Sequence, residues 1–129
     1  MSARKRSFMP FDIDKFRVRR PDESFWEADL GAILDDYQSR YFSDVRQQIT
    51  SVVFVSSLDG PALVKPQVGR IEVDERVRNF PKLCCFLVLH ELINNKLYWR
   101  YGHEQDYSSP EYRKEVSAMR RRKAYDGLL

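Results

Sequence analysis

One segment of this sequence restricts the fold more than any other. From Leu83 to Ile93 the chain reads Leu-Cys-Cys-Phe-Leu-Val-Leu-His-Glu-Leu-Ile, which is apolar on every side of a helix apart from one His-Glu pair. A helix that is apolar on all faces has to be buried among other elements. We therefore predict a central, buried helix over residues 82 to about 101. Because a buried carboxylate is costly unless it has a partner or faces a cleft, Glu91 is a candidate functional residue.

The segments on either side of this helix predict two further helices. Ser24 and Glu27 have the spacing of a capping box, and the apolar residues after them recur at intervals of three and four. This periodic set is Trp26, Leu30, Ile33, Leu34, Tyr37 and Tyr41. It predicts a helix with one face on the core. Near the C-terminus, Ser109 and Pro110 are a capping serine and a proline at the first helical position, and they predict the start of the last helix.

Two short segments have the patterns of strands. Residues 49–55 are β-branched and mostly apolar, which predicts a buried strand. After Gly69, residues 71–74 alternate between apolar and acidic side chains, as in a half-buried strand. Residues 59–61, Asp-Gly-Pro, predict a turn between the two segments.

The length and composition predict a single soluble domain. A chain of 129 residues has room for one hydrophobic core, and 43% hydrophobic with 32% charged residues is typical of globular proteins. We divide it into a basic arm (1–22), a folded domain (23–125) and a tail (126–129). No apolar run approaches the roughly 18 residues of a membrane span, so no membrane association is expected. The adjacent Cys84 and Cys85 cannot join distant segments, and we expect them to be buried small residues. Free cysteines suit a reducing compartment, which predicts a cytoplasmic location.

Basic residues concentrate at the two ends of the chain, although the net charge is only +3. Such clusters can bind nucleic-acid phosphates, or they can be solvated ends that complement a helix dipole. We favour the second interpretation and keep nucleic acid as a candidate partner. The clusters are Arg4, Lys5 and Arg6; Arg17, Arg19 and Arg20; and Arg120, Arg121, Arg122 and Lys123.

The candidate catalytic chemistry lies on the central helix. His90 and Asn94 are one turn apart on the same face, so their side chains can converge on one ion. Glu91 points about 100° away, near enough to reach a metal-bound water. In the motif His-Glu-x-x-His, two imidazoles hold zinc and the glutamate takes a proton from the bound water. Here Asn94 replaces the second imidazole, and its neutral oxygen is a poor zinc ligand.

The rest of a ligand set is less defined. His103 is the only other histidine, thirteen residues after His90, and is the second candidate nitrogen ligand. A carboxylate could complete the set, and spacing singles out none of Glu104, Asp106, Glu111 and Glu115. In the alternative interpretation His90 is an ordinary core histidine and Glu91 pairs with a cation. The candidate cations are Arg70, Arg76, Arg78 and Lys96.

The segment from about Ile71 to Glu115 resembles the SprT-like zinc metallopeptidase family, zincins that include the Spartan-type proteases acting on proteins crosslinked to DNA. The resemblance is carried by the apolar helix running into residues 89–93, by Tyr98-Trp99, and by Gly102-His103. It implies an α+β, zincin-like single domain, with a small antiparallel or mixed sheet packed on a buried active-site helix and flanking helices.

The resemblance also implies zinc, with His90, His103 and the Asn94 position at the metal and Glu91 as general base. Two functions then remain open. The chain is a zinc-dependent peptidase-like domain with a degenerate motif, acting on a protein or peptide through a water activated by the metal and Glu91. Alternatively, it is an inactive pseudo-peptidase that serves as a protein- or nucleic-acid-binding module.

Overall fold

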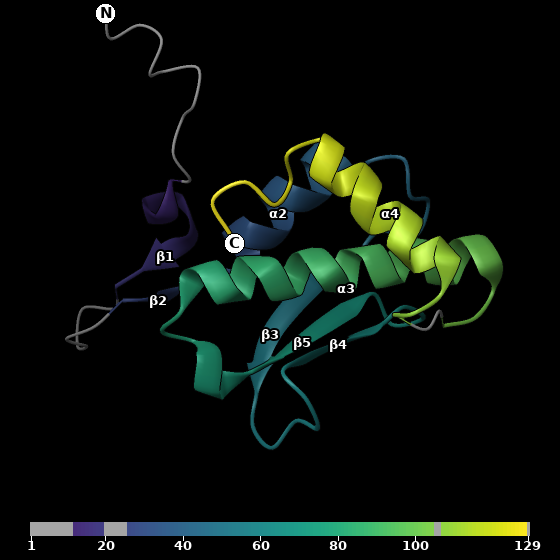
Figure 1. Cartoon of the computed structure of the whole chain (residues 1–129). Helices are drawn as coiled ribbons and strands as arrows, with labels where there is room; N and C mark the ends of the chain where they lie inside the picture. The colour runs from purple at the N-terminus through teal and green to yellow at the C-terminus, as the bar shows by residue number, and fades with distance from the viewer. Residues whose placement is uncertain (1–11, 20–25, 105–106, 129) are drawn as a thin grey trace, which may run out of the picture.

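The computed structural model describes residues 12–19, 26–104 and 107–128. Its centre is the long helix α3 (Pro81–Tyr101), which lies across a three-stranded sheet (Figure 1). Helix α2 (Leu30–Tyr41) packs against both α3 and the sheet. Helix α4 (Pro110–Arg121) packs on α3 and lies on the side away from the sheet (Figure 1). The fold class is α+β, as predicted.

The three-stranded sheet is mixed and has the order β3-β5-β4. Strand β3 (Ser51–Val55) is parallel to β5 (Arg70–Asp74), and β4 (Ala62–Lys65) is antiparallel to β5. Strand β4 therefore lies at an edge, and no other strand in the described part of the chain pairs with its outer side. A second, two-stranded sheet joins β1 (Arg17–Val18) to β2 (Glu27–Ala28), and 3-10 helices η1 (Ile13–Phe16) and η2 (Glu75–Val77) precede β1 and α3.

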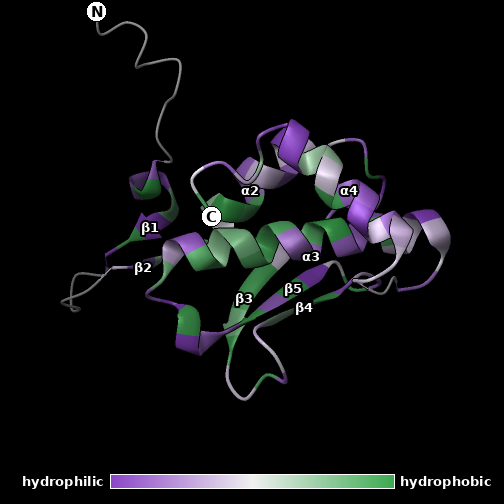
Figure 2. Cartoon of the chain, viewed as in Figure 1, coloured by the Kyte–Doolittle hydropathy of each residue, from purple (hydrophilic) through white to green (hydrophobic). Residues whose placement is uncertain are grey.

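Helix α3 has the predicted position and burial. Pro81 occupies its first turn, and Gly102 ends it in the left-handed conformation, with φ of 83°. A left-handed residue after the last turn is a common way to end a helix, and glycine adopts it without steric cost. Buried side chains face all sides of the middle of α3, and hydrophobic residues predominate along it and along β3 (Figure 2).

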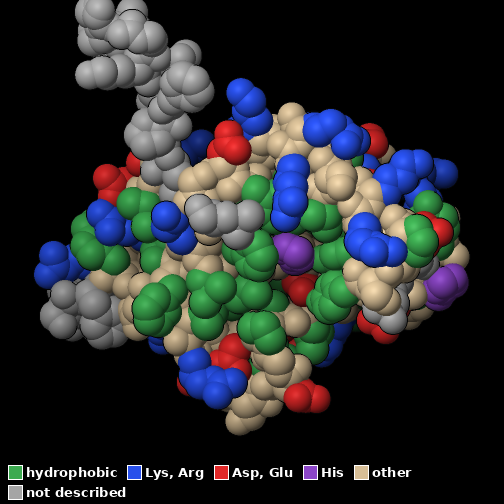
Figure 3. Space-filling view, viewed as in Figure 1, with side chains coloured by type: hydrophobic (Ala, Val, Ile, Leu, Met, Phe, Trp, Pro, Cys, Tyr) green, Lys and Arg blue, Asp and Glu red, His purple; other side chains and the backbone are tan. Residues whose placement is uncertain are grey.

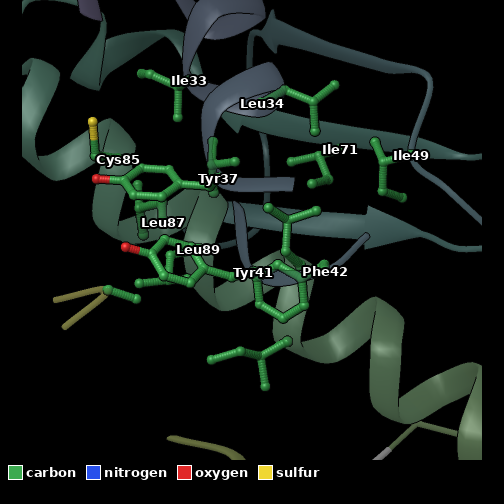
Figure 4. Packing of buried hydrophobic residues seen from close by; sticks show 14 of the residues in the cluster. Ile33, Leu34, Tyr37, Tyr41, Phe42, Ile49, Ile71, Cys85, Leu87 and Leu89 are labelled. Carbon is green, nitrogen blue, oxygen red and sulfur yellow. The ribbon is translucent and has the colours of Figure 1, made fainter. Parts of the chain in front are cut away.

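The hydrophobic core lies between α2, α3 and the sheet. Ile33 of α2, Ile71 of β5 and Leu89 of α3 are completely buried, and Figure 4 shows them in one cluster with Tyr37 and Tyr41. The segment predicted as an arm contributes as well. Phe16, in η1, is buried and stacks on Tyr37, with ring centroids 5.7 Å apart. Phe16 is therefore part of the hydrophobic core, and Arg17 and Val18 pair with β2.

The first predicted helix begins later than expected. Leu30 is its first residue, and the Asp29 side chain caps it by accepting a backbone N–H of the first turn. Glu27 and Ala28, which we predicted to be helical, instead pair with β1 and are buried. Ser24, the predicted cap, lies outside the described residues. The predicted start is wrong because pairing with the preceding strand, β1, determines the structure of Glu27 and Ala28.

The half-buried pattern predicted for residues 71–74 is also wrong, because all four are buried. Strand β5 is the central strand, and α3 packs on one of its faces. On the other face basic side chains cover the two carboxylates. Lys65 lies 3.2 Å from Glu72, and Arg76 lies 2.7 Å from Asp74. These ion pairs allow acidic residues in a buried strand.

The C-terminal basic cluster is divided between solvent and structure. All four residues are exposed, and Arg122 also donates hydrogen bonds to the carbonyls of Arg40 (2.8 Å) and Tyr41 (2.9 Å) at the end of α2. In the described ranges, no helix is long and apolar enough to cross a bilayer.

Candidate functional site

His90 is held between two tyrosines. Its Nδ1 lies 2.6 Å from the hydroxyl of Tyr112 on α4, and its Nε2 lies 3.1 Å from the hydroxyl of Tyr125, which follows α4. Phe86, one turn earlier on α3, packs on the imidazole with ring centroids 4.4 Å apart. A neutral imidazole has one donor and one acceptor, which two hydroxyls satisfy. Burial lowers the pKa of His90, so the neutral form is favoured.

Glu91 is buried, with 5% of its surface exposed. Asn94 Nδ2 donates a hydrogen bond of 3.1 Å to Glu91 Oε1, and the backbone N–H of Val64 on β4 donates to the same carboxylate. Burial raises the pKa of Glu91, and the negative charge of Glu104 raises it further. The carboxylate therefore has neutral donors and an acidic neighbour.

The basic residues that we considered as partners of Glu91 bind elsewhere. Lys96 donates to Glu115 of α4 at 2.8 Å, which joins α3 to α4. Arg70 lies 3.1 Å from Glu72, and Arg76 binds Asp74. Arg78 lies over the ring of Phe54, 5.2 Å from its centroid.

The structure does not bring the predicted zinc ligands together. Between His90 and the end of α3 at Tyr101 the helix rises roughly 16 Å, and His103 follows beyond that end. His103 is exposed, and its Nδ1 is 2.9 Å from the Glu104 carbonyl. Among the residues that the structure describes, no group of three or more His, Cys, Asp or Glu side chains could hold a metal ion.

The side chains present do not fit zinc. A zinc ligand must direct a free nitrogen or anionic oxygen lone pair at the ion, and four donors normally surround it. Tyrosine hydroxyls occupy both nitrogens of His90, and the Nδ2 of Asn94 donates to Glu91, which leaves only a neutral amide oxygen at that position, a poor zinc ligand. Of the candidate carboxylates, Glu115 is paired with Lys96, and Asp106 lies outside the described residues.

A cavity of about 390 Å³ lies between β4 and α3. Glu91, Asn94 and Tyr98 line it from α3, residues 62–64 and Pro66 from β4 and the turn after it, and Glu104 and Tyr107 from the segment after α3. At the turn after β4, Gln67 Nε2 donates a 2.8 Å hydrogen bond to the Tyr98 hydroxyl. In Figure 3 a histidine and an acidic side chain lie among hydrophobic side chains over α3.

Three parts of this site escape sequence reasoning. Tyr112 and Tyr125 lie 22 and 35 residues after His90, too far for any helical or strand spacing to pair them with it. Strand β4 has only four residues, Ala62 to Lys65, with no alternation. Tyr98, which the sequence indicates only among the residues of the family resemblance, also lines the cavity. The one available signal was the apolar face of the last helix, which includes Tyr112.

Comparison with known proteins supports the fold. No protein-family model matches the chain, and no curated protein matches it. The crystal structure of the metallopeptidase zymogen jannalysin from Methanocaldococcus jannaschii superimposes with a TM-score of 0.55, over 78% of this chain and 82% of that chain, at 16% identity. The chain is similar in fold to a metallopeptidase. At this identity the likeness concerns the fold alone, and the finer assignment to the SprT-like family stays a prediction.

Proposed function

We propose that this chain is a peptide-binding domain that binds an extended polypeptide between β4 and α3 and does not hydrolyse it through zinc. The observation that supports this most is the cavity, which opens beside an edge of the sheet where, in the described part of the chain, no further strand pairs with β4. The metallopeptidase-like fold is consistent with a polypeptide ligand.

The outer edge of β4 has the backbone geometry to accept another strand. The carbonyl of Pro61 accepts a hydrogen bond of 2.9 Å from the N–H of Asp74, so residue 61 faces β5. Because backbone groups alternate along an antiparallel strand, Ala62 and Val64 face outward. The Val64 N–H, directed at Glu91, agrees with this alternation. An extended peptide added at this edge would gain main-chain hydrogen bonds.

The donor atoms on α3 support binding over hydrolysis. Zinc chemistry at this helix would need a free nitrogen of His90, and both nitrogens are within hydrogen-bond distance of tyrosine hydroxyls. The same contacts pack the imidazole among aromatic rings. His90 therefore acts as a structural residue that joins α3 to α4 and the C-terminal segment.

The proposal is tested by titrating the ¹⁵N-labelled protein with a panel of extended, uncharged or singly charged octapeptides. We expect shifts of the Ala62 and Val64 amides, with Val52 on β3 as the internal control. Ala62→Pro, which removes an outward N–H without removing a hydrogen bond to β5, should weaken binding roughly tenfold.

The same peptides are incubated with the protein and zinc and then examined by mass spectrometry. We expect them to remain intact. Zinc-dependent cleavage that disappears in Glu91→Gln would establish a peptidase instead. Peptide binding that does not shift the Ala62 and Val64 amides would show that the peptide does not bind at the β4 edge.

A further inference from the structure

We infer that the cavity between β4 and α3 binds a cationic alkyl group, the guanidinium of an arginine side chain or the ammonium of a lysine side chain. The inference rests on the proposed function only for the source of that group, a docked peptide. The affinity of the cavity for the cation itself can be measured without any peptide.

The charge of the cavity wall is the first reason. Glu91 and Glu104 both line the cavity, and none of its lining residues is Lys or Arg. The described partners of the Glu91 carboxylate, the Asn94 amide and the Val64 N–H, are neutral. Neutral donors stabilise a buried carboxylate without cancelling its charge, so a bound cation would be attracted through a medium of low dielectric constant.

The second reason is that the lysines near Glu91 form ion pairs with other carboxylates. Lys96, on the same helix as Glu91, binds Glu115 at 2.8 Å, with only 13% of its side chain exposed. Lys65, at the end of β4, binds Glu72 on β5. Neither lysine is available to Glu91 while its own ion pair is intact. A cation from outside meets the carboxylates without breaking either pair.

The apolar and aromatic part of the wall fits the rest of such a side chain. Tyr98 and Tyr107 line the cavity together with Val64 and Pro66. Aromatic faces attract cations, and arginine and lysine bury their methylene stems against apolar surface. A volume of about 390 Å³ lies near the lower end of the usual range for ligand cavities, roughly 300–1,000 Å³, and suits one long side chain.

The experiment uses n-butylguanidinium and its neutral isostere n-butylurea, each titrated into the ¹⁵N-labelled protein at pH 7. We expect n-butylguanidinium to shift the amides of Glu91, Tyr98 and Glu104 and to bind at least about tenfold more tightly than n-butylurea, because a hydrogen bond to a charged partner adds about 1.5–3 kcal/mol, a factor of ten or more. Equal affinity of the two compounds, or shifts outside the cavity only, would overturn the inference.

Variants identify the carboxylates. Glu104→Gln changes an exposed residue and should keep the fold while lowering the affinity for n-butylguanidinium severalfold, and Glu91→Gln should remove most of the preference over n-butylurea. Glu75→Gln, an exposed carboxylate on η2 outside the cavity, is the matched control and should change nothing. An unchanged preference in both cavity variants would contradict the inference.

Two octapeptides that differ only in a central arginine or citrulline separate this inference from the proposed function. Tighter binding of the arginine peptide than of the citrulline peptide, with shifts of the β4 amides, supports both the cation site and peptide binding. Equal binding of the two peptides together with no response to n-butylguanidinium overturns the cation site and leaves peptide binding intact. A response to n-butylguanidinium with no binding of either peptide overturns peptide binding and leaves the cation site. No response to any of them overturns both.

Discussion

Two adjacent residues, His90 and Glu91, respond to the same burial in opposite directions. Removal from water disfavours the charged form of each group, so the pKa of His90 is lowered and that of Glu91 is raised. His90 is satisfied by two hydroxyls, whereas Glu91 faces a cavity with another carboxylate on its wall. The pair therefore combines a residue held by two tyrosines with a residue that lines a cavity.

Glu91→Gln should change the pH dependence of stability. A carboxyl group whose pKa is raised by folding stabilises the protein below its ordinary value of 4.5, and that stability is lost as the pH rises through the folded pKa. Glutamine keeps an acceptor for Asn94 and Val64 and has no charge to bury. The variant should therefore gain stability over the parent as the pH rises from about 4 to 8, measured by urea unfolding. A difference independent of pH would contradict this, and Glu75→Gln serves as control.

At the residue scale the burial of Glu91 could be predicted from the sequence, and the hydrogen-bond partners of His90 and Asn94 could not. The all-apolar surroundings of Glu91 predicted its burial, and burial is observed. The spacing of His90 and Asn94 predicted a shared metal ion, but Asn94 bonds Glu91 and His90 bonds Tyr112 and Tyr125. Helical spacing shows which side chains share a face of the helix. It contains no information about which residues of other elements, such as Tyr112 and Tyr125, contact that face.

At the scale of elements, predictions succeeded where local chemistry sets a boundary. Ser109 caps α4 and Pro110 begins it, and Gly102 ends α3, as the sequence indicates. They failed where the pairing of one strand with another decides the structure. Residues 27–28 form β2 because β1 lies beside them, and β4 is a strand because β5 pairs with it.

The length of α3 leads to a prediction about metal binding. Asn94→His places a second imidazole one turn from His90, yet His103 remains beyond the end of the helix and both nitrogens of His90 remain bonded to tyrosines. We expect this variant to show no zinc-dependent increase in Tm at zinc excess. An increase of several degrees that chelator reverses would mean that the tyrosines release His90 readily. Adding Tyr112→Phe and Tyr125→Phe to the variant tests that release directly.

At the scale of the whole molecule, α3 connects all other parts. It packs against both of the other helices, against β4 and β5 of the larger sheet, and against η1, β2 and η2. The segment after α4 completes its cover, since Ala124 and Tyr125 are buried and Tyr125 lies 6.0 Å from Phe86, centroid to centroid. The C-terminal segment is thus a structural part of the domain.

Truncation after Arg121 should therefore lower the free energy of unfolding by about 3 kcal/mol or more, through lost burial of Tyr125, an unsatisfied His90 nitrogen and the loss of the Arg122 hydrogen bonds to α2. Truncation after Tyr125 removes only the predicted tail and should cost less than about 1 kcal/mol, because Leu128 is only partly buried. Urea unfolding monitored by tryptophan fluorescence gives both values. Equal losses from the two truncations would mean that residues 122–125 add little to stability.

The reactivity of the two thiols of α3 reports the unfolding of the core around this helix. Cys84 and Cys85 are completely buried, and burial raises the pKa of each to about 12. Alkylating reagents react with the thiolate form of cysteine. In the folded chain the sulfur atoms are inaccessible to the reagent, and the fraction of thiolate is very small. The thiols become reactive only when α3 leaves the core. The rate at which a small alkylating reagent modifies the unaltered protein therefore reports how often α3 separates from the core, without any added label.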